Sequence, residues 1–147
     1  MIEKNTDDLN EMLTELRVLL PGSQLLKAFL IMLPFHSGFK QIIQTDKWIF
    51  MATFIFSITS LILFTAPAIQ HRLMRPLRNR LKFKQFATRQ MIAGAIALSF
   101  ALVLGADLVM SIVFGHLLGN TITTFVAVII IILWWLLPAI WKRRGFI

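Results

Sequence analysis

The sequence predicts an all-α, polytopic membrane protein with four transmembrane helices and an amphipathic helix before the first of them. Apolar residues make up 57% of the 147 residues, and the mean hydropathy of +0.75 is far above that of a soluble domain of this length. Four segments are long enough, or nearly so, to cross a hydrocarbon core of about 30 Å, which takes about 20 helical residues. The basic residues gather in one loop and near the C-terminus, a distribution typical of the cytoplasmic side of membrane proteins.

Residues 1–21 are predicted to form an amphipathic cytoplasmic helix. Apolar residues recur there at three- and four-residue spacing, while the acids stay largely off that stripe. Thr6 can cap the helix, and Pro21 with Gly22 is predicted to end it. Helices on a membrane surface usually carry a basic polar face, but this face is acidic, so we expect it to pack against the chain's own basic loop. A solvated helix that packs against nothing is the alternative.

The four transmembrane helices are predicted over residues 22–39, 48–69, 91–114 and 122–140, within a single membrane domain that covers 1–147. The acidic N-terminus and the absence of a small-residue cleavage site lead us to expect that the first helix is not a signal peptide. The loop over 70–90 contains no acid and is expected in the cytoplasm together with both termini. Anionic lipid headgroups, and not nucleic acid, are the expected partners of its basic side chains. These side chains are Arg75, Arg78, Arg80, Lys82, Lys84 and Arg89.

Signs of enzyme chemistry are missing from the sequence. There is no cysteine, the three histidines lie too far apart to form a local ligand motif, and no nucleotide, hydrolase or zinc-protease motif occurs. We therefore expect no enzymatic activity, no cofactor and no metal site.

Two of the predicted helices carry stripes of small or polar residues. Thr53, Ser57 and Ser60 lie on one face of the second span, and this stripe continues through Phe64 and Pro67 to His71. Such hydroxyls are typical of hydrogen bonds between helices, and an ion pathway is the alternative. On the third span small residues recur every fourth position and predict close approach of a neighbouring helix. They are Ala93, Ala97, Ala101 and Gly105.

Asp107 interrupts the otherwise uncharged third span. An ionised carboxylate at this depth costs about 2.5 to 3.5 kcal/mol on insertion scales, so it must be paired, hydrated or protonated. At about 1.5 Å per residue, Asp107 lies roughly 24 Å from the cytoplasmic edge and His36 about 18 to 21 Å, so the two can pair if their helices adjoin. Ser111 shares a face with Asp107, and Lys27 is expected to extend to the cytoplasmic headgroups. Structural pairing with His36 or a hydroxyl, a proton or cation site, and contact with another subunit remain open for Asp107.

Three segments resemble a family of small four-helix bacterial inner-membrane proteins of unknown function, some of which are labelled automatically as sodium:proton antiporters. The segments are "ELRVLLPGSQLLKAFLIMLPF", "LFTAPAIQHRL" and "LGADLVMSIVFG". The resemblance implies a bacterial inner-membrane location, and the chain departs from it at Lys27, where a small or polar residue is expected, and at His36, where glutamine is expected. The matching residues are Glu15, Leu16, Arg17, Gln24, Pro34, Phe35, Ala66, Pro67, His71, Arg72 and Asp107.

Two functions follow as hypotheses. The first is transport or conduction of protons or monovalent cations by a homo-oligomer, because four spans are few for alternating access and copies could supply the missing surface. The second is a membrane adaptor that docks a protein partner through its acidic helix and basic loop. The adaptor hypothesis assumes a network of charge-assisted hydrogen bonds among residues at the cytoplasmic boundary of the membrane. The alternative is that these residues only fix the orientation of the helices in the membrane. The network residues are Glu15, Arg17, Gln24, His71 and Arg72.

Overall fold

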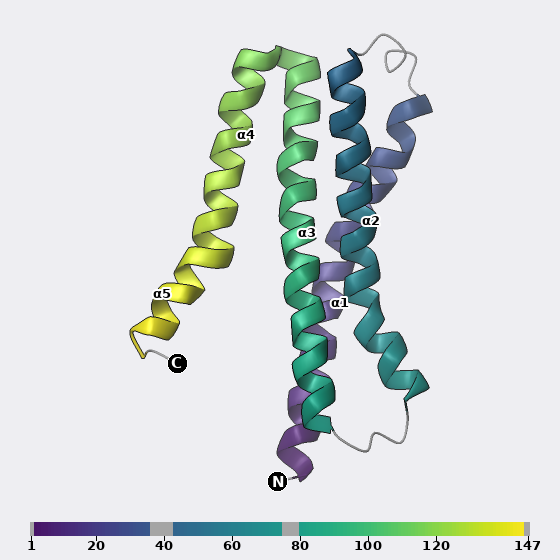
Figure 1. Cartoon of the computed structure of the whole chain (residues 1–147), viewed down its shortest axis with the longest axis vertical. Helices are drawn as coiled ribbons and strands as arrows, with labels where there is room; N and C mark the ends of the chain where they lie inside the picture. Colours follow the sequence, from purple (N-terminus) through teal and green to yellow (C-terminus); the bar gives the residue numbers. More distant parts are fainter. Residues whose placement is uncertain (1, 36–42, 75–79, 146–147) are drawn as a thin grey trace. The chain divides into compact units, whose positions relative to one another are not determined.

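The chain is all-α, and four of its helical segments are long and apolar enough to cross a membrane. A computed structural model describes residues 2–35, 43–74 and 80–145, and of residues 2–13, 15, 19 and 80 it describes the backbone alone. Within these ranges the membrane-length segments are Leu16–Phe35, Gln44–Leu73, Leu81–Phe114 and His116–Arg143. The four helices expected from the sequence are confirmed by length and composition, and Figure 1 shows their order along the chain.

The predicted end of the first helix at Pro21 is wrong. Helix α1 (Ile2–Met32) runs through Pro21 and is followed by the 3₁₀ turn η1 (Leu33–Phe35). Proline removes one hydrogen bond and crowds the preceding turn, but Pro21 is exposed, so its ring does not disturb the packed face. That face continues on both sides of Pro21. Packing against neighbouring helices therefore stabilises the helix at the point where the proline removes a backbone hydrogen bond.

The predicted loop over residues 70–90 is also largely helical. Helix α2 (Gln44–Leu73) ends inside it, and helix α3 (Arg80–Phe114) begins inside it. Lysine, arginine and glutamine are good helix formers, and residues 80–90 contain neither glycine nor proline. The charge of this segment predicted a loop, but charged side chains of these types do not make a segment irregular.

Two compact units divide the chain. Unit 1 comprises Met1–Lys40 and Phe54–Leu98, and unit 2 comprises Gln41–Thr53 and Ser99–Ile147. Helices α2 and α3 each contribute one part to unit 1 and the other part to unit 2.

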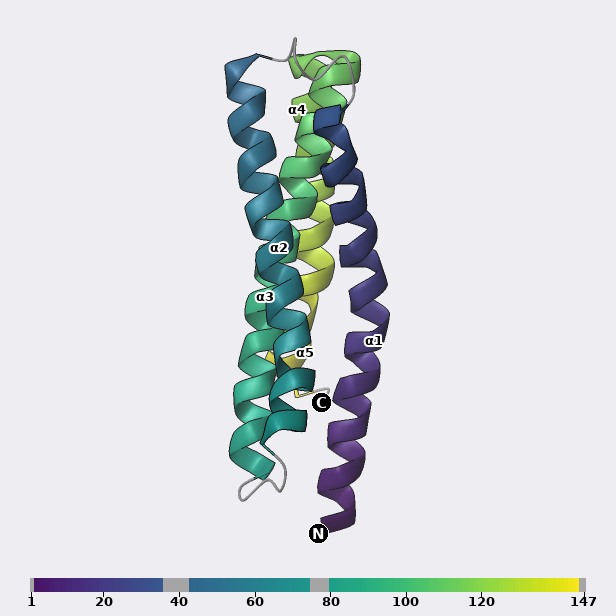
Figure 2. The same cartoon turned by 90° about the vertical axis from the view of Figure 1, so that its right-hand side faces the viewer.

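Unit 1 packs α1 against the second part of α2 and the first part of α3. The predicted stripe on α2 is buried, with Ser57, Ser60, Phe64 and Pro67 fully enclosed in unit 1 and Thr53 fully enclosed in unit 2. Its hydroxyls do not make the hydrogen bonds between helices that the sequence led us to expect, because Thr53 Oγ1 donates to Ile49 O at 2.7 Å and Ser60 Oγ donates to Ser57 O at 2.8 Å, both within α2. Spacings of three and four residues place one buried side chain on each turn of a single face. Both views show α1 passing beside this part of α2 (Figures 1 and 2).

Close approach in unit 1 occurs at Gly94 of α3. A Cβ atom at this position would lie 2.8 Å from Cε1 of Phe64 and 3.2 Å from Cβ of Leu63. The predicted small-residue ridge is therefore displaced by one residue at this end, because Ala93 is exposed while Gly94 is buried. Nearer the start of α3, Phe83 and Ala87 form a small buried cluster.

Unit 2 is built on a tight hairpin between α3 and helix α4 (His116–Ile130). Gly115 links them with φ 84°, a left-handed conformation that favours glycine. After α4 the chain widens into a π-helical turn, η3 (Ile131–Leu136), and then forms α5 (Leu137–Arg143), with Pro138 in its first turn. The proline ring would clash with the carbonyl four residues earlier, and a widened turn relieves that clash.

Candidate functional site

Asp107 meets a hydroxyl group from the neighbouring helix. Thr123 Oγ1 of α4 donates to Asp107 Oδ1 of α3 across 3.4 Å, a long hydrogen bond. Both residues belong to unit 2, and Asp107 is partly buried. Among the described residues this hydroxyl is the one hydrogen-bond partner found for the carboxylate. A hydroxyl can orient a carboxylate, but it cannot neutralise its charge.

Ser111 lies one turn beyond Asp107 and is enclosed by α4. It is 7% exposed, and its Oγ has no hydrogen-bond partner within the described part of the chain. The enclosure comes from Gly119 on α4, where an added Cβ would lie 2.5 Å from Ser111 Oγ and 2.9 Å from its backbone nitrogen. The absence of a side chain at Gly119 thus brings the two helices together beside Asp107.

A second carboxylate of unit 2 is buried at the start of α2. Asp46 is 5% exposed, and its Oδ1 has no hydrogen-bond partner among the residues that the structure describes. Its backbone N–H donates to Ile43 O at 3.0 Å. An acid in the first turn complements the helix dipole. That interaction does not supply a hydrogen-bond donor to the buried Asp46 Oδ1.

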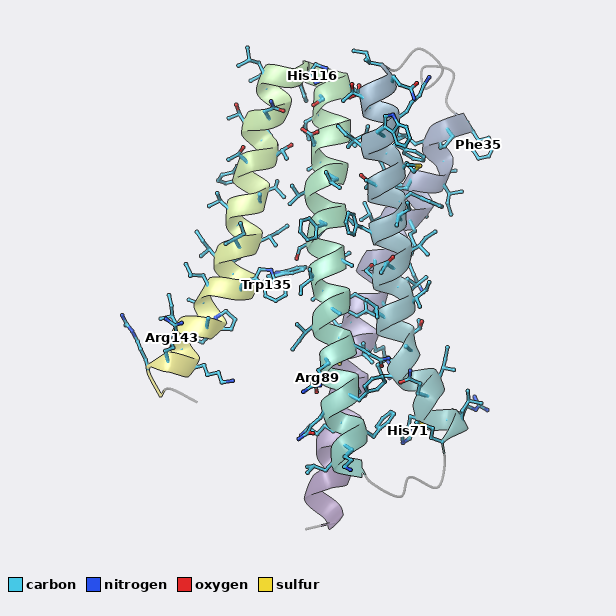
Figure 3. All side chains as sticks on the ribbon, in the orientation of Figure 1. Phe35, His71, Arg89, His116, Trp135 and Arg143 are labelled. Carbon is cyan, nitrogen blue, oxygen red and sulfur yellow. The ribbon has the colours of Figure 1, made fainter. Side chains whose placement is uncertain are left out.

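Residue counts place these groups near the same end of unit 2. At about 1.5 Å per residue, Asp46 lies about 3 Å from the start of α2, Ser111 about 4.5 Å from the end of α3 and Asp107 about 10 Å from it. Thr123 lies about 10 Å from the start of α4, level with Asp107. Figure 1 shows the start of α2 and the end of α3 at the same height, and Figure 3 labels His116 at the start of α4. We call the oxygen-bearing side chains of Asp46, Asp107, Ser111 and Thr123 the unit 2 oxygen cluster.

Sequence reasoning found two members of this cluster and missed the other two. Asp107 and Ser111 were expected, whereas Thr123 and Asp46 were not. The predicted partner His36 lies outside the described residues. Nothing in the sequence singled out Thr123 among the hydroxyls of its segment, but the loop glycines Gly115 and Gly119 indicate a tight hairpin, which would have placed α4 beside Asp107.

The predicted cytoplasmic network stays a prediction. Arg17, Gln24 and Arg72 are exposed, and the side chain of Glu15 is not among those described. The His71 ring lies 5.9 Å from the ring of Phe83 at a tilt of 46°, a contact with α3 that sequence reasoning missed. Figure 3 labels His71 near the end of α2.

The predicted lipid contacts also stay predictions. Arg75 and Arg78 lie outside the described residues, as does the side chain of Arg80. The remaining side chains lie on the first turns of α3, and Figure 3 shows Arg89 pointing away from α2. Lys82 and Arg89 are exposed and Lys84 is partly buried.

The unit 2 oxygen cluster offers carboxylate and hydroxyl oxygens and no softer ligand. In the described ranges no group of three or more His, Cys, Asp or Glu could hold a metal ion. A carboxylate beside a hydroxyl, such as Asp107 with Thr123, suits a proton that is bound and released, or a monovalent cation that prefers oxygen ligands. Such a pair does not make the dense acidic cage that calcium takes.

Comparison with known proteins identifies a family. The model of a "Family of unknown function (DUF6328)" matches residues 2–138. The chain belongs to this family. No match was found among curated proteins or among solved structures. The resemblance drawn from the sequence motifs is confirmed for a small four-helix protein of a family of unknown function.

Proposed function

We propose that this protein carries protons or monovalent cations across the bacterial inner membrane, as a homo-oligomer whose ion site contains Asp107. The observation that supports this most is the setting of Asp107. It lies on a membrane-length apolar helix, and its described partner is a single hydroxyl at 3.4 Å. A carboxylate in that setting needs a proton, water or a cation.

The other oxygens of unit 2 support the same proposal. Asp46 Oδ1 and Ser111 Oγ are buried without partners among the described residues. Orphaned buried polar atoms indicate a proton, ion or water that satisfies them, because leaving them unsatisfied costs about 1 to 3 kcal/mol each. The cluster draws side chains from three helical segments, so movement of any one of them would change its ion affinity.

Oligomerisation completes the proposal. The segment His116–Arg143 leaves most of its large apolar side chains exposed, including Leu117, Phe125 and Leu133. In a membrane these side chains contact lipid or another copy of the chain. Four helices offer little surface for alternating access, and several copies would supply it.

A membrane adaptor is the second candidate function. The exposed Arg72 and Arg89 favour it, because they lie where the end of α2 and the start of α3 could present cations to an acidic partner. Both functions are compatible with N- and C-termini in the cytoplasm.

Flux measured in proteoliposomes separates the two functions. The purified protein is reconstituted, and proton, Na⁺ and K⁺ movement is followed under gradients of each ion, with protein-free liposomes as the control. We expect movement of at least one of these ions well above the control. Flux at the level of empty liposomes for all three would remove the transport proposal and leave the adaptor.

A further inference from the structure

The basic side chains of unit 1 differ in whether a molecule from outside can reach them. Lys27 is 7% exposed, contrary to the prediction that it extends to the lipid headgroups, because it lies on the packed face of α1 with the fully buried Leu30. On α3 the side chain of Lys84 is partly buried, whereas those of Lys82 and Arg89 are exposed. Lys82 and Arg89 are therefore the described basic side chains of α3 that a ligand reaches most easily.

Lys82 and Arg89 share one face of α3 with Phe86. The three residues follow one another at spacings of four and three, which places them within about 60° around the helix, and Lys82 and Arg89 lie about 10 Å apart along its axis. Phe86 is 53% exposed. Figure 3 shows Arg89 pointing away from α2, so this face is distinct from the one that packs against α2.

The same face continues as an apolar surface. The next positions at four- and three-residue spacing are Ala93 and Ile96, which are both exposed. No lysine or arginine follows Arg89 on α3, so Arg89 marks the boundary between a cationic part and an apolar part of one exposed face. We call Lys82, Phe86, Arg89, Ala93 and Ile96 the α3 outer stripe, and all of it belongs to unit 1.

Neither α3 nor the adjacent part of α2 supplies an acid to this stripe. No aspartate or glutamate occurs between Asp46 and Asp107, and Asp46 belongs to the part of α2 in unit 2. Asp107 follows Arg89 by eighteen helical residues, which is about 27 Å along the axis. An anionic ligand would bring the opposite charge that these two segments lack.

A phospholipid with an anionic headgroup has the same order of chemical groups as the stripe. Its phosphate matches the cations, and its acyl chains match the apolar surface beyond Arg89. The stripe lies on the membrane-length segment Leu81–Phe114, where such a lipid would run along the helix. A second copy of the chain fits less well, because copies in one membrane have the same orientation and would bring Lys82 and Arg89 against their own equivalents.

We propose that the α3 outer stripe binds one anionic phospholipid. The guanidinium of Arg89 donates to the phosphate, since its fork of N–H groups suits phosphate oxygens, and Lys82 adds positive charge further along the headgroup. Phe86 lies between the two cations, and the surface of Ala93 and Ile96 contacts an acyl chain. This site involves no residue of the unit 2 oxygen cluster, so it is independent of the proposed transport.

Lipid binding to the purified full chain in neutral detergent tests the proposal. Phosphatidylglycerol and phosphatidylcholine with the same acyl chains are titrated separately, and bound lipid is counted by native mass spectrometry. We expect one phosphatidylglycerol per chain to bind in preference to phosphatidylcholine. The double variant Lys82→Gln with Arg89→Gln should weaken phosphatidylglycerol binding about thirtyfold, for two cations lost near an anionic headgroup.

A matched control separates the stripe from net charge. Lys142 and Arg143 are exposed on α5, and Lys142→Gln with Arg143→Gln removes the same charge as the test variant. This control should bind phosphatidylglycerol as wild type does. Glycerol phosphate, which carries the phosphate without acyl chains, should not displace the lipid at equal concentration.

Three outcomes would overturn the lipid site. Equal binding of the two lipids by the wild type would leave the cations for another partner, such as an acidic protein. An equal loss in the test variant and in the control would reduce the effect to net charge, and displacement by glycerol phosphate would indicate a site for free phosphate.

Photocrosslinking provides a second measurement if the test variant does not fold. A phosphatidylglycerol with a photoactivatable acyl chain is added to the wild type, and labelled peptides are identified by mass spectrometry. Labelling within residues 82–96 supports the site, and labelling confined to other segments overturns it.

Discussion

Replacement of Gly119 by alanine tests the closest approach between α3 and α4. The new Cβ would lie 2.9 Å from the backbone nitrogen of Ser111 and 3.0 Å from its Cα. Ordinary van der Waals contact begins at 3.4 Å, so the two helices would have to separate by about half an ångström at this contact. The Ser111 hydroxyl can rotate away, but its backbone cannot.

The cost of this separation follows from overpacking. Inserting a methyl group into a packed contact costs about 1 to 3 kcal/mol, and alanine returns up to about 1 kcal/mol of helix propensity relative to glycine. Gly22→Ala is the matched control, because an added Cβ there meets nothing within 4 Å and only the propensity gain remains. The two variants should therefore differ in stability by about 1 to 3 kcal/mol, with Gly119→Ala the less stable.

Unfolding by sodium dodecyl sulfate, followed by tryptophan fluorescence, measures this difference. Gly119→Ala should also weaken the Asp107–Thr123 contact, because that contact is already 3.4 Å long and lies one turn further along α4. Equal free energies of unfolding for Gly119→Ala and Gly22→Ala would refute the close approach, and with it the geometry of the unit 2 oxygen cluster.

Three further predictions use the same assays. Gly94→Ala should destabilise the protein by about 1 to 3 kcal/mol, because its Cβ would meet the buried ring of Phe64 at 2.8 Å; wild-type stability would contradict the packing of unit 1. Thr123→Val should raise the half-saturating cation concentration for flux about threefold, for loss of a hydrogen bond between helices, and its exposed neighbour Thr124→Val should not. Pro21→Ala should raise the free energy of unfolding by up to about 3 kcal/mol if the helix is continuous, whereas a helix that ends there would gain nothing.

The sequence predicted much of the fold because burial and spacing act locally. Long apolar runs define the four membrane-length helices. The spacing of Ser57, Ser60 and Phe64 predicted one shared face on α2, and the structure buries that face, but Ser60 Oγ bonds within its own helix and not to a neighbouring one. The end of α1 was mispredicted because Pro21 was read as a helix end from the sequence alone, without the packing of the residues on either side of it. Pro21 is exposed and the packed face continues past it.

The candidate site was predicted only in part, because it depends on contacts between segments. Asp107 stands out in the sequence as an acid in an apolar run, but its partner Thr123 depends on how tightly α3 and α4 approach, and Gly119 sets that distance. Lys27 was misplaced for a similar reason. Its long side chain permits either lipid contact or burial, and only the packed face of α1 decides between them.

Ion flux through the Asp107→Asn variant tests the central proposal most directly. The amide keeps the shape and polarity of the side chain but can neither carry a negative charge nor bind and release a proton. We predict that the variant folds and assembles as wild type in detergent but shows no proton or cation flux above protein-free liposomes. Flux at the wild-type rate would contradict the account, and if the variant were also about 1 kcal/mol less stable, Asp107 would be a structural partner of Thr123.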